Sequence, residues 1–161
     1  MLKRLSCLLS VVFLSACTAV NSGVGGMFNF DTDLKLVFSI ADNINPDEQD
    51  NASPLFVRFY ELKSDKAFNQ ADFFSLYEDD QGALGEDMLG KRELKRMAPG
   101  EAREERFVVA PDTRYVALFA EFFQFKDAKY KVIFPVTSKN IVRNTIRIEI
   151  QSNNLILKSA N

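Results

Sequence analysis

Apolar and polar residues alternate along several short stretches of the chain. Every second residue from Leu34 to Ile40 is apolar, and Ile146, Ile148 and Ile150 repeat this pattern near the end of the chain. A period of two places the apolar side chains on one face of an extended strand and the polar side chains on the other. These stretches therefore predict strands that are buried on one face only.

Two longer runs are apolar on both faces. Residues 55–62 are rich in aromatic and β-branched side chains, which favours an interior strand, and residues 114–125 form the longest apolar run. The run 114–125 predicts a strand with one face on the main core and the other face on a different element. Shorter strands are predicted at residues 92–97, 107–109, 130–134 and 155–158, the first of them a charged edge strand.

One segment between the predicted strands has a helical period instead. Apolar residues recur there at Phe68, Ala71, Phe74 and Tyr77, with Phe73 and Leu76 widening the stripe. This spacing predicts one or two short helices between residues 67 and 77, with the stripe packed on a sheet. Residues 78–90 are acidic and contain three glycines, which favours a loop.

Turn residues separate the predicted strands. Pro99-Gly100 and residues 126–129 form polar turns, and Asn153-Asn154 suits a tight hairpin because Asn tolerates positive φ. Many short strands divided by such turns are typical of a β-sandwich, whereas parallel sheets need helical crossovers. The sequence therefore predicts an all-β fold, a two-sheet β-sandwich of about eight strands with a short helical insertion.

The connection between the first two predicted strands is longer than a hairpin requires. Residues 43–53 read Asn-Ile-Asn-Pro-Asp-Glu-Gln-Asp-Asn-Ala-Ser, which is polar and acidic with a single proline. This composition predicts a solvated loop. On composition alone it is an ordinary acidic loop.

The first 16 residues have the features of an export signal. Lys3 and Arg4 precede the apolar run 8–14, and small residues follow it, as in a secretory signal peptide. The apolar run is too short to span a bilayer as a lasting helix. We therefore expect residues 1–16 to be a signal peptide, residues 17–32 a tether, and residues 33–161 one folded domain.

The end of this signal is specific in sequence. Leu14-Ser15-Ala16-Cys17 resembles the lipobox of bacterial lipoproteins, in which cleavage leaves the cysteine as the acylated first residue. The resemblance implies that Cys17 carries the lipid, palmitate included, and two or more acyl chains give stable attachment. In such lipoproteins an Asp directly after the cysteine favours retention in the inner membrane. Here Thr18 occupies that position, which implies that the chain goes to the outer membrane. The alternative is an ordinary secretory signal that leaves a free thiol on Cys17.

The tether begins directly after the cysteine. Residues 18–32 include Ser22-Gly23 and Gly25-Gly26 and have neither a strand nor a helix period, which is typical of a flexible linker. Met27, Phe28 and Phe30 leave two interpretations open, because these side chains either pack on the edge of the domain or remain with the linker.

Charge and cysteine content limit the possible functions. Without the signal the chain loses two basic residues, so its formal charge of −2 becomes −4, which argues against nucleic acid as a partner. Cys7 is lost with the signal and Cys17 is acylated, so the mature chain forms no internal disulfide. The chain has no His, which rules out a Ser-His-Asp triad and the usual zinc site.

Three apparent motifs fail on inspection. Residues 85–91 have the spacing of a phosphate loop, but Arg92 occupies the position of the required hydroxyl. The acidic run that starts at Glu78 lacks the closing Glu of a calcium loop. Asp42, Asp47 and Asp50 lie close in sequence, yet nothing indicates the burial that would make one of them an acid catalyst. We therefore expect no catalytic residues, no metal site, no cofactor and no enzymatic activity.

Several segments together resemble the TssJ family, the outer-membrane lipoproteins of the type VI secretion system. The matching segments, which join the lipobox, are Asn45-Pro46-Asp47, residues 53–63, Phe68, Ala71-Asp72-Phe73 and Leu76, with residues 115–122 and 146–150 at the later strands. The resemblance implies a transthyretin-like β-sandwich with a helical insertion, in agreement with the predicted elements. Glu61 stands where the family often has Gln, and residues 78–90 match no family pattern.

The resemblance also implies a function and a partner. Proteins of this family hold TssM, the large inner-membrane subunit, to the outer membrane by binding its periplasmic C-terminal part, in several copies within the secretion complex. The loop between the first two strands serves that contact, which here implies Asn43, Ile44, Asn45, Pro46, Asp47, Glu48, Gln49, Asp50, Asn51, Ala52 and Ser53. Ile44 and Pro46 are the apolar candidates for anchors, and the acidic residues would set orientation and association rate.

Two other functions remain as alternatives. The many phenylalanines are compatible with a periplasmic lipoprotein that carries a hydrophobic ligand, which would require a cavity inside the sandwich. A periplasmic hydrolase would instead require clustered, buried acidic residues.

Overall fold

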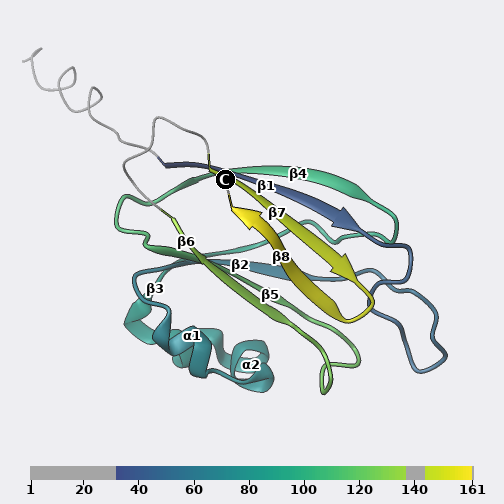
Figure 1. Cartoon of the computed structure of the whole chain (residues 1–161). Coiled ribbons are helices and arrows are strands. Elements are labelled where there is room, and N and C mark those ends of the chain that lie inside the picture. Colours follow the sequence, from purple (N-terminus) through teal and green to yellow (C-terminus); the bar gives the residue numbers. More distant parts are fainter. Residues whose placement is uncertain (1–31, 137–143, 161) are drawn as a thin grey trace, which may run out of the picture. The chain divides into compact units, whose positions relative to one another are not determined.

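The computed structural model describes residues 32–136 and 144–160 (Figure 1). The expected signal peptide, Cys17 and the tether up to residue 31 lie outside the described residues. The elements, in chain order, are β1 (Thr32–Ile40), β2 (Val57–Leu62), α1 (Lys66–Gln70), α2 (Phe73–Leu84), a 3-10 turn (Gly85–Asp87), β3 (Met88–Glu93), β4 (Ala102–Val109), β5 (Tyr115–Ala120), β6 (Lys131–Pro135), β7 (Asn144–Gln151) and β8 (Asn154–Ala160).

The strands form two four-stranded sheets. One sheet has the order β4-β1-β7-β8 and the other has the order β3-β2-β5-β6. Neighbouring strands are antiparallel except β1 and β7, which are parallel and whose arrows point the same way in Figure 1. The apolar inner faces of the sheets pack on each other, so the prediction of a two-sheet β-sandwich is confirmed.

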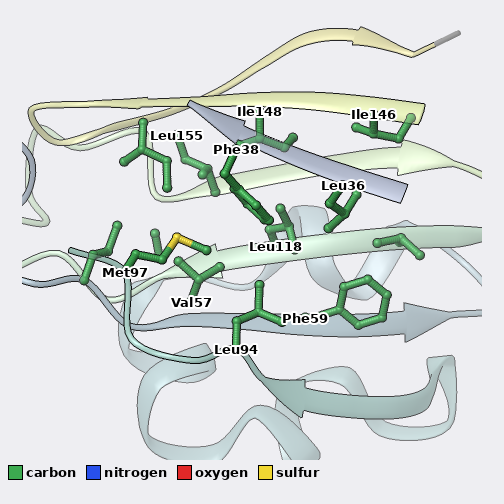
Figure 2. Packing of buried hydrophobic residues seen from close by; sticks show 14 of the residues in the cluster. Leu36, Phe38, Val57, Phe59, Leu94, Met97, Leu118, Ile146, Ile148 and Leu155 are labelled. Atoms are coloured by element: carbon green, nitrogen blue, oxygen red, sulfur yellow. The ribbon is translucent and has the colours of Figure 1, made fainter. Parts of the chain in front are cut away.

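The core between the sheets comes from the alternating strands. Leu36 and Phe38 of β1 and Ile148 of β7 are almost fully buried, as their period of two predicts. Figure 2 shows these side chains extending toward Val57 and Leu118 of the other sheet. Within the same core the rings of Phe59 and Phe107 stack with centroids 4.3 Å apart. Burial of these side chains is the main source of stability, because no disulfide is expected.

A second apolar cluster covers the outer face of the sheet β3-β2-β5-β6. Tyr60 of β2 and Phe119 of β5 point away from the first core and pack against Phe68 of α1 and Phe73 and Leu76 of α2. The expectation that residues 114–125 would contact a second element with their other face is therefore confirmed for β5. The predicted stripe is only partly right, because Phe74 and Tyr77 are 52% and 48% exposed.

The prediction of a loop at residues 78–90 is wrong. Helix α2 starts at its cap Asp72, whose side chain accepts the N–H of Ser75 at 2.8 Å, and it continues to Leu84, with a kink at Asp79. Residues 88–93 then form edge strand β3. The acidic residues suggested a loop, but Asp80 is buried against cations from two strands, a contact that local sequence does not show.

Other boundaries differ from the predictions by several residues. The charged edge strand exists as β3 at 88–93 instead of 92–97, and β4 begins at Ala102, well before the predicted 107–109. The hairpin turn lies at Ser152-Asn153, with positive φ at Ser152, one residue before the predicted pair. The missed part of β4 carries charged side chains on both faces, so it has no apolar alternation, and Arg103, whose side chain is only 9% exposed, is paired with Glu101.

Candidate functional site

Four connections meet at one end of the sandwich. Strand β1 runs about 30 Å from Thr32 to Ile40, and the loop 43–53 follows its far end. The register of the strands brings the other three connections to the same end. We call this the distal end and define it as residues 41–56, 94–101, 121–130 and 152–153. The opposite end of β1, where the strand begins at Thr32, also holds the β4–β5 turn at residues 110–114.

The inner part of the loop 43–53 belongs to the core. Ile44 is fully buried and packs with the residues between the sheets, and Asn45 is only 2% exposed. The expectation of Ile44 as an apolar anchor for the partner is therefore corrected, because its side chain is buried and fastens the loop to the domain. Sequence could not show this, since one isolated apolar residue in a polar segment has no period.

Asn45 joins the loop to two neighbouring segments. It has positive φ (46°), a conformation that Asn adopts more easily than most residues. Its Nδ2 donates to the carbonyl of Pro54 at 3.0 Å, and its Oδ1 accepts the backbone N–H of Phe123 at 2.8 Å. Its own N–H donates to the carbonyl of Ser152 at 3.0 Å. Both side-chain ends and the backbone N–H are thus satisfied inside the protein.

Asp47 organises the outer part of the loop. Its Oδ1 accepts the backbone N–H groups of Gln49 and Asn51, each at 2.9 Å. These bonds, first that from Asn51, hold the pKa of the Asp47 carboxyl below its ordinary value. Asp50 has positive φ (62°) at the tip of the turn. The tip therefore has a defined conformation built from local hydrogen bonds, as in other Asx turns.

The structure divides the predicted loop residues by exposure. Ile44 and Asn45 are buried, and Pro46, Asp47 and Ser53 are half-buried. The exposed side chains are those of Asn43, Glu48, Gln49, Asp50, Asn51 and Ala52. A partner that meets the loop therefore meets a polar surface, with the ring of Pro46 as its partly accessible apolar element.

Two exposed aromatic residues of the distal end were missed by sequence reasoning. Phe123, in the connection between β5 and β6, is 65% exposed, and Phe56, just before β2, is 52% exposed. Gln124 follows Phe123 and donates its side-chain N–H to the carbonyl of Asp47 at 2.7 Å. In the sequence Phe123 continues the alternation of β5, so the pattern predicted a strand there. The strand ends at Ala120, and a turn follows at residues 123–124.

A buried ionic cluster lies on the outer face of the second sheet. Arg58 of β2 donates to Glu121 at 2.6 Å and to Asp80 of α2 at 3.0 Å, and Lys91 and Tyr60 also donate to Asp80, each at 2.9 Å. Burial acts to raise the pKa of the Asp80 carboxyl, but the hydrogen bonds from Lys91, Tyr60 and Arg58 outweigh it and hold this pKa below its ordinary value. Every carboxylate of the cluster is thus paired, which fits a structural role.

Neither a metal-binding cluster nor a membrane-spanning helix is found in the described part of the chain. In residues 32–136 and 144–160, no group of three or more His, Cys, Asp or Glu residues could hold a metal ion. Within the same residues, no helix has the length and apolar character needed to cross a membrane. Residues 85–91, the rejected phosphate loop, form a 3-10 turn and the start of β3. The distal end, which has exposed aromatic rings and a braced polar loop, is accordingly the candidate functional site.

Comparison with known structures finds chains of the same fold. The T6SS lipoprotein TssJ1 from Pseudomonas aeruginosa is 27% identical with a TM-score of 0.74, and the match covers 81% of this chain and 97% of that one. Serratia marcescens Lip, described as a membrane-bound component of the type VI secretion system, is 22% identical with a TM-score of 0.69, covering 80% and 97%. A chain of a structure titled "Type VI membrane complex" is 20% identical with a TM-score of 0.69, covering 80% and 99%.

Comparison with protein families gives the assignment. A search of curated proteins finds no match. The model of the family described as "Type VI secretion lipoprotein, VasD, EvfM, TssJ, VC_A0113" matches residues 32–153, which is most of the chain and nearly all of the described sandwich. The resemblance inferred from the sequence is thereby confirmed. This chain belongs to the T6SS-SciN family of type VI secretion lipoproteins, the family that includes TssJ.

Proposed function

We propose that this lipoprotein is a non-enzymatic adaptor that fastens the type VI membrane complex to the outer membrane. Its acylated Cys17 inserts in the outer membrane, and the folded domain faces the periplasm. The loop 43–53 at the distal end binds the periplasmic C-terminal part of the inner-membrane subunit TssM. Several copies of the adaptor take part in one complex.

The observation that carries this proposal is the position of the loop. The lipid site precedes β1, whereas the loop 43–53 follows the far end of β1, about 30 Å along the strand. An adaptor needs its partner surface away from the point where the anchored segment joins the domain, and the distal end lies at the other end of β1 from that junction. The loop is also braced by Asn45 and Asp47, so a partner would meet a preformed surface.

Structures of similar fold support the choice of partner. One similar chain, with a TM-score of 0.65 and 20% identity, belongs to a structure titled "T6SS protein TssM C-terminal domain (869-1107) from EAEC". The structure titled "Type VI membrane complex" also holds a chain of this fold. At these identities the likeness extends to the fold, and the choice of TssM as the partner of this chain is part of the proposal.

The ligand-carrier alternative receives less support from the described residues. A carrier needs space between its sheets, and here buried side chains of both sheets, such as Phe38, Phe59 and Leu118, fill that region (Figure 2). The hollows at the distal end lie at the surface and are lined by charged as well as apolar residues. Binding of a protein partner is the better match to this arrangement.

A steric block at the loop tests the proposal without removing any bracing residue. Gln49 is exposed and its side chain makes no hydrogen bond within the described residues, so Gln49→Cys should leave the fold intact. Coupling a bulky maleimide polymer to this thiol should abolish binding of the periplasmic C-terminal part of TssM, measured by titration calorimetry with the detergent-purified chain.

The matched control carries the same polymer at the opposite end. Asp112 is exposed in the β4–β5 turn, so labelled Asp112→Cys should bind TssM as the unlabelled chain does. If the label on Gln49→Cys left the affinity unchanged, the loop would not be the contact surface. If the label abolished binding at both Gln49→Cys and Asp112→Cys, the assignment of the contact to the distal end would be wrong.

The membrane attachment has its own test. Cys17→Ser should remove incorporation of labelled palmitate and shift the chain from the outer-membrane fraction to the soluble periplasmic fraction. The folded domain should remain unchanged, because Cys17 precedes the sandwich in sequence. Labelled palmitate on the Cys17→Ser chain would refute this cysteine as the lipid site.

A further inference from the structure

Phe123 is the most exposed of the large apolar side chains in the described part of the chain. It is 65% exposed, whereas Phe74 and Tyr77, the exposed aromatics of α2, each make ring contacts with Phe73. No described aromatic ring packs on Phe123. Aromatic side chains often form the centre of a binding surface, and this one lies at the same end of the domain as the loop 43–53.

The backbone around Phe123 is fixed by the loop 43–53. The N–H of Phe123 donates to Asn45 Oδ1 at 2.8 Å, and Gln124 Nε2 donates to the carbonyl of Asp47 at 2.7 Å. The preceding residue, Phe122, is buried. The exposed ring therefore projects from a backbone that is held on both sides, which lowers the entropy lost when it binds.

An unpaired acceptor lies beside the ring. Asn153 Oδ1, in the β7–β8 turn, is buried and has no hydrogen-bond donor. Asn153 and Phe123 line the same hollow of about 250 Å³, together with Gln124, Phe125, Lys126 and Asp127. This oxygen is buried, so it is not itself a contact atom, but the hollow next to it offers a partner space beside Phe123.

We propose that Phe123 is the principal anchor of the TssM contact, and that Asn45 and Asp47 act by positioning it. This inference rests on the proposed function. The ring enters an apolar recess of the periplasmic C-terminal part of TssM, whose rim lies against the hollow beside Phe123. The exposed polar residues of the loop border this anchor and set the orientation of the partner.

Continuity with the loop is the reason for choosing TssM as the occupant. Asn45 bonds directly to the backbone of Phe123, so a partner that covers the loop 43–53 also reaches the ring. The loop itself offers mainly polar side chains, and its one large apolar residue, Ile44, is buried. A contact of useful affinity therefore needs an apolar anchor from outside the loop, and Phe123 meets that need at the same end.

The test compares Phe123→Ser with substitutions in the loop tip. Phe123→Ser should weaken binding of the TssM periplasmic part about 30-fold or more. The double substitution Glu48→Ser with Gln49→Ser, at exposed positions, should change the affinity by about threefold or less. Val108→Ser removes a 51% exposed apolar side chain near the opposite end and should leave binding unchanged. Thermal melting of each chain confirms that the fold is retained.

The positioning role of Asn45 is tested by a double-substitution cycle. Asn45→Ala should weaken TssM binding in the parent chain, but in the Phe123→Ser background it should add about threefold or less. Asn45→Asp keeps an acceptor for the N–H of Phe123 and should restore most of the binding that Asn45→Ala loses. If Asn45 had a purely structural role, the losses of binding free energy caused by Asn45→Ala and by Phe123→Ser would add up in the double variant.

The outcomes separate this inference from the function on which it rests. If Phe123→Ser binds TssM as the parent does while the loop-tip substitutions abolish binding, the anchor assignment is overturned and the adaptor function stands. If the parent chain itself does not bind TssM, the proposed function fails, and the anchor assignment fails with it.

Discussion

Asn45 holds three segments of the distal end together. One side-chain amide satisfies the carbonyl of Pro54 and the N–H of Phe123, and the backbone N–H reaches Ser152. The two side-chain bonds also fix the orientation of the amide, because a carbonyl can only accept and an N–H can only donate. Asn45 is only 2% exposed, so a substitute that lacked either the donor or the acceptor would leave buried polar groups unpaired.

Replacing Asn45 by Asp should expose this dependence. The new carboxylate keeps the bond from Phe123 but sets an oxygen against the carbonyl oxygen of Pro54, so the free energy of unfolding should fall by about 2 kcal/mol near neutral pH. Burial should raise the pKa of this carboxyl, and its protonated form can donate to Pro54. The loss in free energy of unfolding relative to the parent should therefore be smaller at about pH 5 than at about pH 7.

Urea denaturation of the parent, Asn45→Asp and Asn45→Ala at both pH values measures this effect. Asn45→Ala has no group that titrates, so its loss should be the same at the two pH values. A loss for Asn45→Asp that does not change with pH would show that Pro54 does not face this side chain.

Single residues mark where sequence reasoning succeeded and where it failed. Leu36 and Ile148 were predicted correctly because they belong to alternating strands, in which period decides burial. Ile44, Asn45 and Phe123 were not, because their burial or exposure depends on which connections meet at the distal end. That meeting is set by strand pairing over long sequence distances, which one sequence does not display.

At the scale of elements, the two helices depend on side chains from the sheet. Helix α1 has five residues, too few to be stable alone, and Lys131 of β6 donates to the carbonyls of Phe68, Asn69 and Ala71 at its end. Arg58 of β2 likewise donates to the carbonyl of Leu76 in α2. The acidic second half of α2 was predicted as a loop because local composition does not include these cations.

Asp80 should be the residue that makes α2 sensitive to acid. Its pKa is held low in the folded state by Lys91, Tyr60 and Arg58 against the effect of burial. A lowered pKa contributes stability that is complete at neutral pH and is lost as the pH falls through that pKa. Asp80→Asn should therefore cost about 3 kcal/mol near neutral pH, and this difference from the parent should narrow under acid conditions.

Denaturation curves of the parent and Asp80→Asn between about pH 7 and about pH 3 measure this narrowing. Asp112→Asn, in the exposed β4–β5 turn, is the matched control and should leave stability within about 0.5 kcal/mol of the parent. A difference between parent and Asp80→Asn that stays constant with pH would contradict the assigned pairing.

At the scale of the whole domain, topology gathers the connections of the distal end. Strand β1 pairs in parallel with β7 and antiparallel with β4, and these pairings bring the loop 43–53, the 94–101 connection and the β7–β8 turn to one end. The number of strands and the sandwich class could be predicted from alternation and turn signals. The parallel pair could not, because no local pattern distinguishes a parallel from an antiparallel neighbour.

The most direct test of the adaptor assignment is amide hydrogen exchange of the full chain with and without the TssM periplasmic part. Exchange reports protection of individual backbone segments, so it maps the contact without any substitution. If TssM binds at the distal end, exchange in the complex should be slower for residues 47–51 and 122–126 and unchanged in the turn 110–114. Slower exchange confined to residues 110–114, or a saturated complex with no added protection at the distal end, would refute TssM binding at this surface.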